Sequence, residues 1–235
     1  MAKRIPLEKK VLSENDRLAS ELAERFAAAR VLAVNLLSSP GAGKTSLLEE
    51  TARRLGTELR LAAVEGDLAT DRDARRLRAA GLPTRQINTG RGCHLSARQV
   101  ADALSDFDGD GRPLDLEALD ILFIENVGNL VCPAQFHLGE RQRVVVSSTP
   151  EGDDKPLKYP VAFESADCVV LNKVDLLEAT LFSCEAFRRY VRGLAPRAPI
   201  LELSCRTGAG LDAWLDWLRE ERQAARKGRG LADSI

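Results

Sequence analysis

The sequence predicts an α/β protein with a mostly parallel, doubly wound sheet that carries helices on both faces. Short apolar runs, of the kind that a strand buried on both faces requires, recur at residues 31–37, 59–64, 121–124, 144–146, 168–171 and 200–203. Helix-like segments, such as residues 45–55 and 211–226, alternate with these runs, and this alternation indicates crossover connections between parallel strands. A glycine-rich segment directly follows the first run.

Length and composition indicate one main domain. A chain of 235 residues that is 44% hydrophobic is long enough to bury one sizeable core. Ahead of the first strand, Leu18, Leu22 and Phe26 recur at helical spacing after Ser13, where we expect an amphipathic helix to begin. The sequence therefore predicts a helical arm over residues 1–29, a main domain over 30–226 and a flexible tail over 227–235.

Charge and cysteine usage narrow the class of protein. The formal net charge is -1, so no basic field favours nucleic acid as a partner. The sequence shows neither an apolar run long enough for a membrane span nor the apolar stretch of a secretory signal. Five cysteines, an odd number spread along the chain, favour reduced thiols over a disulfide framework. We therefore expect a cytoplasmic protein that interacts with neither nucleic acid nor membrane.

Residues 38–45 read Ser-Ser-Pro-Gly-Ala-Gly-Lys-Thr between a strand and a helix, the context that a phosphate-binding loop needs. Glycines let the backbone curl its N–H groups around phosphates, and the helix N-terminus adds positive potential. Lys44 would neutralise β/γ-phosphate charge, and Thr45 would bind Mg²⁺. Ser38 departs from the motif, which begins with glycine. The prediction is a P-loop NTPase that binds nucleotide through Pro40, Gly41, Ala42, Gly43, Lys44, Thr45 and Ser46.

A second motif indicates that the base of the bound nucleotide is guanine. Asn172, Lys173 and Asp175 follow a strand with the spacing of the guanine-recognition motif Asn-Lys-x-Asp, and the Asp175 carboxylate would accept both guanine N–H donors. Adenine would leave that carboxylate facing a ring nitrogen without a proton, so GTP is preferred over ATP. Residues 204–206, after the next strand, resemble the second base-contacting loop of GTPases, which adds Ser204, Cys205 and Arg206 to the predicted site.

Carboxylates at strand ends predict a magnesium site. Glu125 ends an apolar run in the manner of a Walker B element, although many GTPases have Asp there, and Gly128 is placed to sense the γ-phosphate. Asp67 ends the preceding predicted strand. We assign Mg²⁺ to Thr45, Asp67 and Glu125, and catalysis to Lys44, Asp67 and Glu125; either carboxylate is also suited to positioning the attacking water. The sequence shows no obvious catalytic glutamine or arginine finger, so slow hydrolysis is expected.

A thiol and an imidazole stand side by side at Cys93 and His94 in a glycine-rich loop, and Cys132 follows the Walker B segment. Thiolate and imidazole suit Ni²⁺ or Zn²⁺, and three ligands leave a site that a second subunit, a partner or water can complete. The same residues are also compatible with purely structural thiols. We expect one straight strand segment to run from Glu125 to Cys132 and to couple the two sites. Structural roles are expected for Cys168, Cys184 and Cys205.

Taken together, these motifs resemble the hydrogenase nickel-incorporation GTPases, the HypB family, which is related to the signal-recognition and urease-accessory GTPases. The Ser38 departure is itself a feature of that family. The resemblance implies that Cys93, His94 and Cys132 bind metal near a homodimer interface, that GTP promotes dimerisation, that a small zinc-containing nickel chaperone, HypA, is a partner, and that the nickel-iron hydrogenase large subunit is the final client. The resemblance is carried by residues 38–45, 65–67, 86–90, 93–95, 125–134 and 154–160.

Several features of the chain depart from the family pattern, and three other functions are compatible with its motifs. The chain shows neither the Cys-rich nickel motif nor the His-rich stretch of some members, so strong nickel storage is not expected. His137 stands where the family suggests Asp; it is an extra ligand or a solvated substitution, and the second is favoured. Lys155 and Lys158 are candidates for contact with the opposite subunit. The alternatives are a urease-accessory GTPase, whose Cys-Pro-His motif Ala134 interrupts, a regulatory GTPase with structural thiols, and a passive metal buffer.

Overall fold

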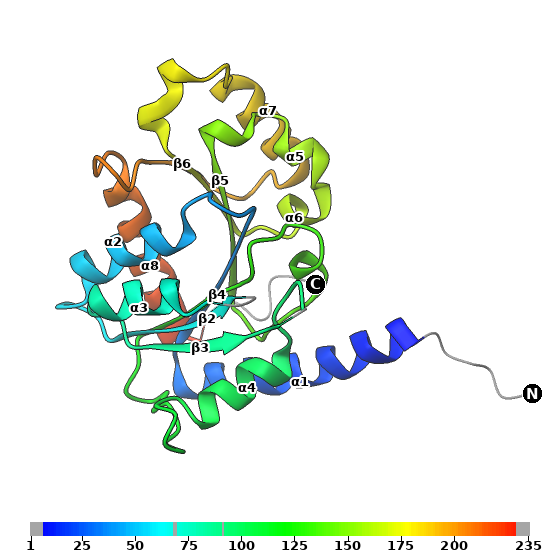
Figure 1. Ribbon diagram of the computed structural model, residues 1–235, viewed down its shortest axis with the longest axis vertical. Helices are drawn as coiled ribbons and strands as arrows, with labels where there is room; N and C mark the ends of the chain where they lie inside the picture. Colours follow the sequence, from blue (N-terminus) through cyan, green and yellow to red (C-terminus); the bar gives the residue numbers. More distant parts are fainter. Residues whose placement is uncertain (1–6, 68–69, 91, 229–235) are drawn as a thin grey trace, which may run out of the picture.

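A computed structural model of the chain describes residues 7–67, 70–90 and 92–228. Its centre is a parallel seven-stranded sheet in the order β3-β2-β4-β1-β5-β6-β7, which confirms the expected fold class (Figure 1). The first strand lies in the middle, as in a doubly wound sheet. The strands are β1 (Leu32–Ser38), β2 (Leu61–Asp67), β3 (Thr84–Asn88), β4 (Ile121–Glu125), β5 (Gln142–Ser148), β6 (Cys168–Asn172) and β7 (Ile200–Glu202).

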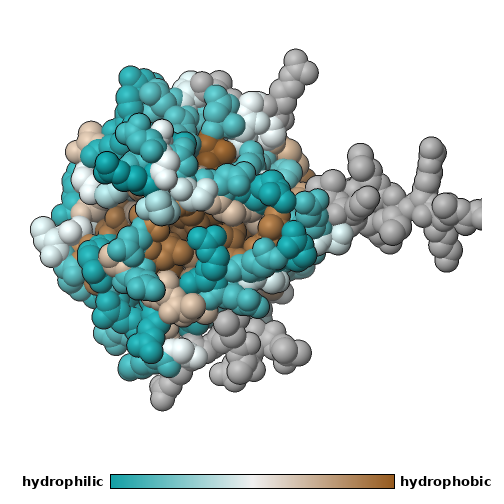
Figure 2. Space-filling view, turned by 90° about the horizontal axis from the view of Figure 1, so that it is seen from below, coloured by the Kyte–Doolittle hydropathy of each residue, from teal (hydrophilic) through white to brown (hydrophobic). Residues whose placement is uncertain are grey.

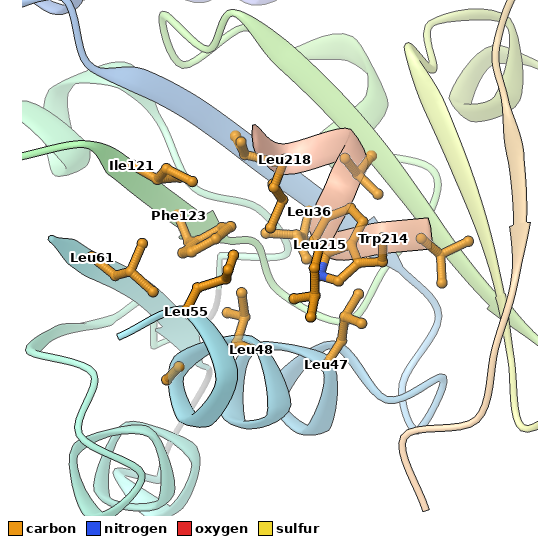
Figure 3. Close-up of a cluster of buried hydrophobic side chains, with 14 of the residues drawn as sticks. Leu36, Leu47, Leu48, Leu55, Leu61, Ile121, Phe123, Trp214, Leu215 and Leu218 are labelled. Carbon is orange, nitrogen blue, oxygen red and sulfur yellow. The ribbon is translucent and has the colours of Figure 1, made fainter. Parts of the chain in front are cut away.

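Helices cover both faces of this sheet. One hydrophobic cluster joins the sheet to α2 and α8, and includes Leu36, Leu48 and Trp214 (Figure 3). On the other face, one cluster packs under α1 and α4 and another under α6 and α7. The helices are α1 (Leu7–Ala29), α2 (Lys44–Leu55), α3 (Arg72–Ala79), α4 (Ala97–Ser105), α5 (Lys155–Lys158), α6 (Pro160–Glu164), α7 (Cys184–Leu194) and α8 (Leu211–Arg226).

Helix α1 begins earlier than the sequence indicated and is packed against the domain. It starts at Leu7 rather than Ser13, and its Leu22 and Phe26 are buried in the cluster that it shares with α4. In Figure 1 the two helices lie side by side. The expected division of the chain at residue 29 stays a prediction, and the predicted arm and tail extend into residues 1–6 and 229–235, outside the described part.

One expected connection is wrong. Strand β4 ends at Glu125 instead of running straight to Cys132, because the following chain turns across the end of β1. The Asn126 N–H donates to the Leu36 carbonyl at 3.1 Å, and Asn129 forms an antiparallel bridge with Ser38. A 3₁₀ turn, η1 (Pro133–Gln135), follows Cys132. The segment between the two predicted sites is therefore a folded loop against the P-loop strand.

One face of the molecule combines polar and apolar residues. Seen from below, hydrophilic residues surround a hydrophobic area near the middle of the face (Figure 2). Among the described residues, the helices include none that combines the length and the apolar character needed to cross a membrane.

Candidate nucleotide and metal sites

The loop between β1 and α2 forms a phosphate cradle that only glycine permits at two positions. Gly41 and Gly43 have φ angles of +78° and +105°, and a Cβ on Gly43 would lie 2.3 Å from the Asn172 Nδ2. Helix α2 begins at Lys44, so its first N–H groups face the cradle. The cavity in front has a volume of about 450 Å³ and is lined by Pro40, Gly41, Gly43, Lys44, Thr45, Ser46, Gly128 and Lys173, among others.

Ser38 takes a defined place in this cradle. Its Oγ accepts a hydrogen bond from the Lys44 Nζ at 2.7 Å and donates to the Ser39 carbonyl at 2.6 Å. Burial lowers the pKa of Lys44, and the nearby Glu125 charge opposes that shift. The serine hydroxyl thus holds the ammonium group at the floor of the cavity, which a glycine could not do.

Carboxylates crowd the opposite wall of the cavity. The Thr45 Oγ1 donates to the Glu125 Oε1 at 2.8 Å, while the second oxygens of Glu125 and Glu65 are buried without a hydrogen-bond partner among the described residues. Burial, then the charges of Glu125 and Asp67, raises the pKa of Glu65 to about 8. Buried carboxylate oxygens beside a hydroxyl are hard ligands. The donor set therefore fits Mg²⁺.

Sequence reasoning assigned Asp67 and Glu125 to this wall and missed three further groups. Asp67 lies with Glu65 and Asp73, one oxygen from each within 4.8 Å of the others. Arg76, also on α3, lines the cavity and donates to Glu49, Asp73 and the Ser46 hydroxyl. The sequence signals for these groups were weak. Glu65 lies two residues before Asp67 in the same strand-end segment, and the i, i+3 charge pair of Asp73 and Arg76 is of a kind common on solvated helices.

A second cavity of about 450 Å³ continues from the first, sharing Gly43, Ser46 and Lys173 with it. The Asn172 Nδ2 donates to the Ala42 carbonyl at 3.0 Å, and the Lys173 Nζ donates to the Gly41 carbonyl at 2.7 Å. The predicted base motif is thus tied to the phosphate loop by two side chains.

Asp175 lies at the far end of this second cavity. Its carboxylate accepts hydrogen bonds from the Ser204 Oγ and, at 2.8 Å, from the Arg206 Nε. The hydrogen bond from Ser204, assisted by Arg206, lowers the pKa of Asp175, which keeps it ionised as an acceptor. The Cys205 N–H donates to the Asn172 Oδ1 at 3.2 Å, so the two predicted base loops meet.

The structure also brings Cys93, His94 and Cys132 together, with one ligand atom from each within 4.8 Å of the others. The Cys93 Sγ lies 3.7 Å from the His94 Nδ1, and the His94 ring stacks on Phe136 with 3.8 Å between centroids. A hydrogen bond with Cys132 raises the pKa of Cys93, and burial lowers that of His94, which favours the neutral imidazole that binds metal. Two thiols and an imidazole fit Ni²⁺ or Zn²⁺.

The other cysteines and His137 lie elsewhere. Cys168 is fully buried in β6, where burial raises the pKa of its thiol. His137 has a side chain that is 67% exposed, and its Nδ1 lies beside Arg143 and Glu140 rather than in the three-residue metal group. Cys184 and Cys205 are half-buried, and burial raises the pKa of both.

Short contacts link the two sites. Asn126 lines the first cavity, and its Oδ1 accepts from the Leu95 N–H, next to His94, at 3.0 Å. The Asn129 Nδ2 donates to the Cys93 carbonyl at 3.3 Å. A Cβ on Gly128 would lie 3.1 Å from the Pro40 Cα, so this segment touches the phosphate loop directly.

Lys155 contacts its own chain. Its Nζ donates to the Ser39 Oγ at 2.9 Å and lies 3.4 Å from a Glu151 oxygen, while Lys158 pairs with Asp154 on the surface. Lys155 therefore adds a cation beside the phosphate loop within a single protein chain.

The chain is similar to a family of known nucleotide-binding proteins. The family model for the CobW/HypB/UreG nucleotide-binding domain matches residues 32–202. A hydrogenase maturation factor HypB from Escherichia coli (strain K12) is 50% identical over 214 residues, which cover 91% of this chain and 71% of that protein. The chain belongs to the CobW/HypB/UreG family.

Solved structures agree with this family assignment. The structure of HypB from Helicobacter pylori in complex with nickel has a TM-score of 0.84 and 39% identity, covering 94% of this chain and 100% of that one. The signal recognition particle receptor FtsY from Elizabethkingia anophelis shares the fold, with a TM-score of 0.51 and 13% identity over 86% of this chain and 73% of that chain. The predicted resemblance to HypB proteins is confirmed.

Proposed function

We propose that this chain is a GTP-hydrolysing metallochaperone that delivers nickel during maturation of nickel-iron hydrogenase. The observation that carries the proposal is Asn126, which lines the phosphate cavity and holds the backbone beside His94. A relative solved in complex with nickel and relatives that are hydrogenase maturation factors support the cargo and the process.

In this proposal the first cavity takes the phosphates and the second takes guanine. Lys44 neutralises β/γ-phosphate charge, and Thr45, Glu125 and Asp67 would hold Mg²⁺, which would supply further positive charge to the phosphates. Asp175 accepts the guanine N–H donors. Asp175 lines the second cavity and the phosphate-loop residues line the first, and the two cavities share residues, so one nucleotide can occupy both.

Hydrolysis is proposed to be slow. The carboxylates at the phosphate end are able to orient an attacking water, but Arg76 is held by Glu49 and Asp73. An arginine so paired has to leave both partners before it can stabilise transferring phosphate charge. We therefore expect turnover by the isolated protein well below the roughly 5–20 s⁻¹ of activator-stimulated signalling GTPases.

The metal group is proposed to hold Ni²⁺ or Zn²⁺ as a releasable cargo site. Cys93, His94 and Cys132 supply three ligands, and a second subunit, a partner or water would supply the rest. On this view GTP promotes a homodimer that completes the site, HypA-type zinc-containing chaperones supply the nickel, and the hydrogenase large subunit receives it. We propose that the protein acts in the cytoplasm.

In this proposal, coupling between the nucleotide site and the metal group controls metal binding. A γ-phosphate that draws Gly128 towards itself would displace Asn126 and Asn129, which hold the backbone at Leu95 and Cys93. Linkage requires that nickel then alter nucleotide affinity by the same factor. The strongest alternative is a regulatory GTPase with structural thiols.

Equilibrium dialysis with Ni²⁺ and Zn²⁺ separates these functions. The proposal expects Cys93→Ala and Cys132→Ala to lose metal binding while GTP binding persists, and Cys184→Ala serves as the matched control. Unchanged metal binding in both variants would support the regulatory alternative. A urease-accessory role is less favoured because Ala134, not His, follows Cys132-Pro133.

A further inference from the structure

Two loops carry the metal group, and both are attached to the same buried asparagine. The Asn15 side chain of α1 is 5% exposed. Its Nδ2 donates to the His137 carbonyl at 2.8 Å, in the loop that follows Cys132, and its Oδ1 accepts from the Ala97 N–H at 2.9 Å, just after the Cys93–His94 loop. One amide therefore spans the gap between the two loops.

A second route connects the same loops through the centre of the sheet. Asn35 is fully buried in β1 among apolar neighbours. Its Nδ2 donates to the Glu140 Oε1 at 3.1 Å, and its Oδ1 lies 3.4 Å from the Asn126 Nδ2. Since Asn126 holds the Leu95 N–H, the chain of contacts reaches the Cys93–His94 loop from inside the sheet.

Glu140 and Arg143 extend this second route to the other ligand loop. Their side chains are each 3% exposed and form an ion pair with a nitrogen–oxygen distance of 2.6 Å. Arg143 also donates to the Ala134 carbonyl at 3.1 Å and the Phe136 carbonyl at 3.0 Å. Phe136 in turn stacks on His94. The loop after Cys132 is thus fixed by a buried guanidinium.

We propose that Asn15 and Asn35 are positioning residues for the metal group, which set the distance between the Cys132 loop and the Cys93–His94 loop. The identity of the metal in this proposal rests on the proposed function, whereas the hydrogen bonds between the two loops are independent of it. Burying an amide destabilises the fold unless the amide is hydrogen-bonded, and both asparagines form their hydrogen bonds with separate segments of the chain. The N-terminal helix is therefore part of the metal site's support.

The test compares Asn15→Ala and Asn15→Asp with the unmodified chain. The aspartate keeps an acceptor for the Ala97 N–H but has no donor for the His137 carbonyl, so only one of the two hydrogen bonds remains. We expect both variants to weaken Ni²⁺ binding about tenfold and to alter the thiolate-to-nickel absorption band, as loss of outer-shell partners does. Asn35→Leu tests the second route with the same readouts.

Thr51→Val is the matched control for stability. Thr51 is also a fully buried polar residue, but it bonds Leu47 and Trp214 on the opposite face of the sheet. We expect it to lower the melting temperature without changing nickel affinity or the absorption band. Two results would overturn the proposal. One is nickel affinity that is equal in the unmodified, Asn15 and Asn35 chains while Cys132→Ala loses nickel. The other is a loss of nickel affinity in Thr51→Val as large as in the asparagine variants.

A metal-free measurement separates this inference from the proposed function. Diamide, a thiol oxidant, should join Cys93 and Cys132 rapidly in the unmodified chain and several times more slowly in Asn15→Ala, as followed by mass spectrometry. If Cys132→Ala keeps nickel while Asn15→Ala still slows the disulfide, the metal assignment fails and the positioning role stands. An unchanged disulfide rate in every asparagine variant refutes the positioning role whatever the metal results.

Discussion

The nucleotide cavities and the metal group are built in different ways. Most residues that the sequence predicted for the cavities lie at strand ends or in one glycine-rich loop, so local sequence largely determines their geometry, and α3 adds Asp73 and Arg76. The three proposed metal ligands lie on two loops that are held by side chains from α1, β1 and β5. We infer that the nucleotide region depends on its own residues, whereas the metal region depends on remote buried supports.

The largest expected effect is at the base end of the nucleotide region. Asp175→Ala removes two charge-assisted acceptor contacts to guanine, each worth about 1.5–3 kcal/mol, so GTP affinity should fall roughly 1,000-fold while ATP affinity stays low and unchanged. Fluorescent-nucleotide titration measures both. Glu178→Ala, an exposed neighbour in the same turn, is the control. A drop of less than tenfold in Asp175→Ala would show that guanine is recognised elsewhere.

Removing a ligand should have the next largest effect. Cys132→Ala is expected to weaken Ni²⁺ binding more than about 100-fold, because loss of an outer-shell partner alone costs 10–100-fold. Its GTP affinity should change little, which would separate the two regions. Isothermal titration with each ligand provides the comparison. Parallel loss of both affinities would mean that the regions are a single structural unit.

A change at the contact between the regions should be smaller. Gly66 lies in β2, and a Cβ there would come within 2.8 Å of Leu95, which follows His94. Gly66→Ala should displace the metal loop and lower nickel affinity about tenfold. Gly193→Ala, with open space around the added carbon, is the control. Nickel binding that tolerates Gly66→Ala as well as Gly193→Ala would argue against close support of the metal loop.

The smallest functional effect is expected at the other end of the sheet. Asp120, 4% exposed just before β4, accepts hydrogen bonds from Arg222, Arg226 and the Arg60 N–H. Burial alone would raise the pKa of Asp120, but the hydrogen bonds and charges of these partners have the larger effect, so the pKa of Asp120 is lowered overall. Asp120→Asn should lower the free energy of unfolding by about 2 kcal/mol and leave both affinities unchanged.

The pH dependence of that stability has a defined sign. Because the folded-state pKa of Asp120 is lowered, its contribution is fully present above the ordinary value of 3.8 and is lost as pH falls through the folded pKa. The difference between the unmodified chain and Asp120→Asn, from urea unfolding, should shrink at acidic pH. Asp212→Asn, whose side chain is 91% exposed, should change stability by less than about 0.5 kcal/mol. A pH-independent difference would exclude the ion pairs as its source.

The same contrast explains what could be predicted from sequence. Six of the seven strands came from apolar runs, but β3, with polar Arg85 and Gln86 at the sheet edge, has no such run. The residues of the phosphate loop follow from motif and context. The partnership of Asn15 with His137 spans 122 positions, and no local spacing reveals a contact of that kind. Asn35 is a polar residue within an apolar run, but its role was not predicted because its partners depend on the folded sheet.

Nickel affinity measured on GDP-loaded and GTP-analogue-loaded protein, with the oligomeric state followed in the same samples, tests the central claim most directly. Coupling through Asn126 and Asn129 predicts affinities that differ at least about fivefold between the two nucleotide states, with a reciprocal change in nucleotide affinity on adding nickel. Equal nickel affinity and equal dimerisation in both states would contradict it.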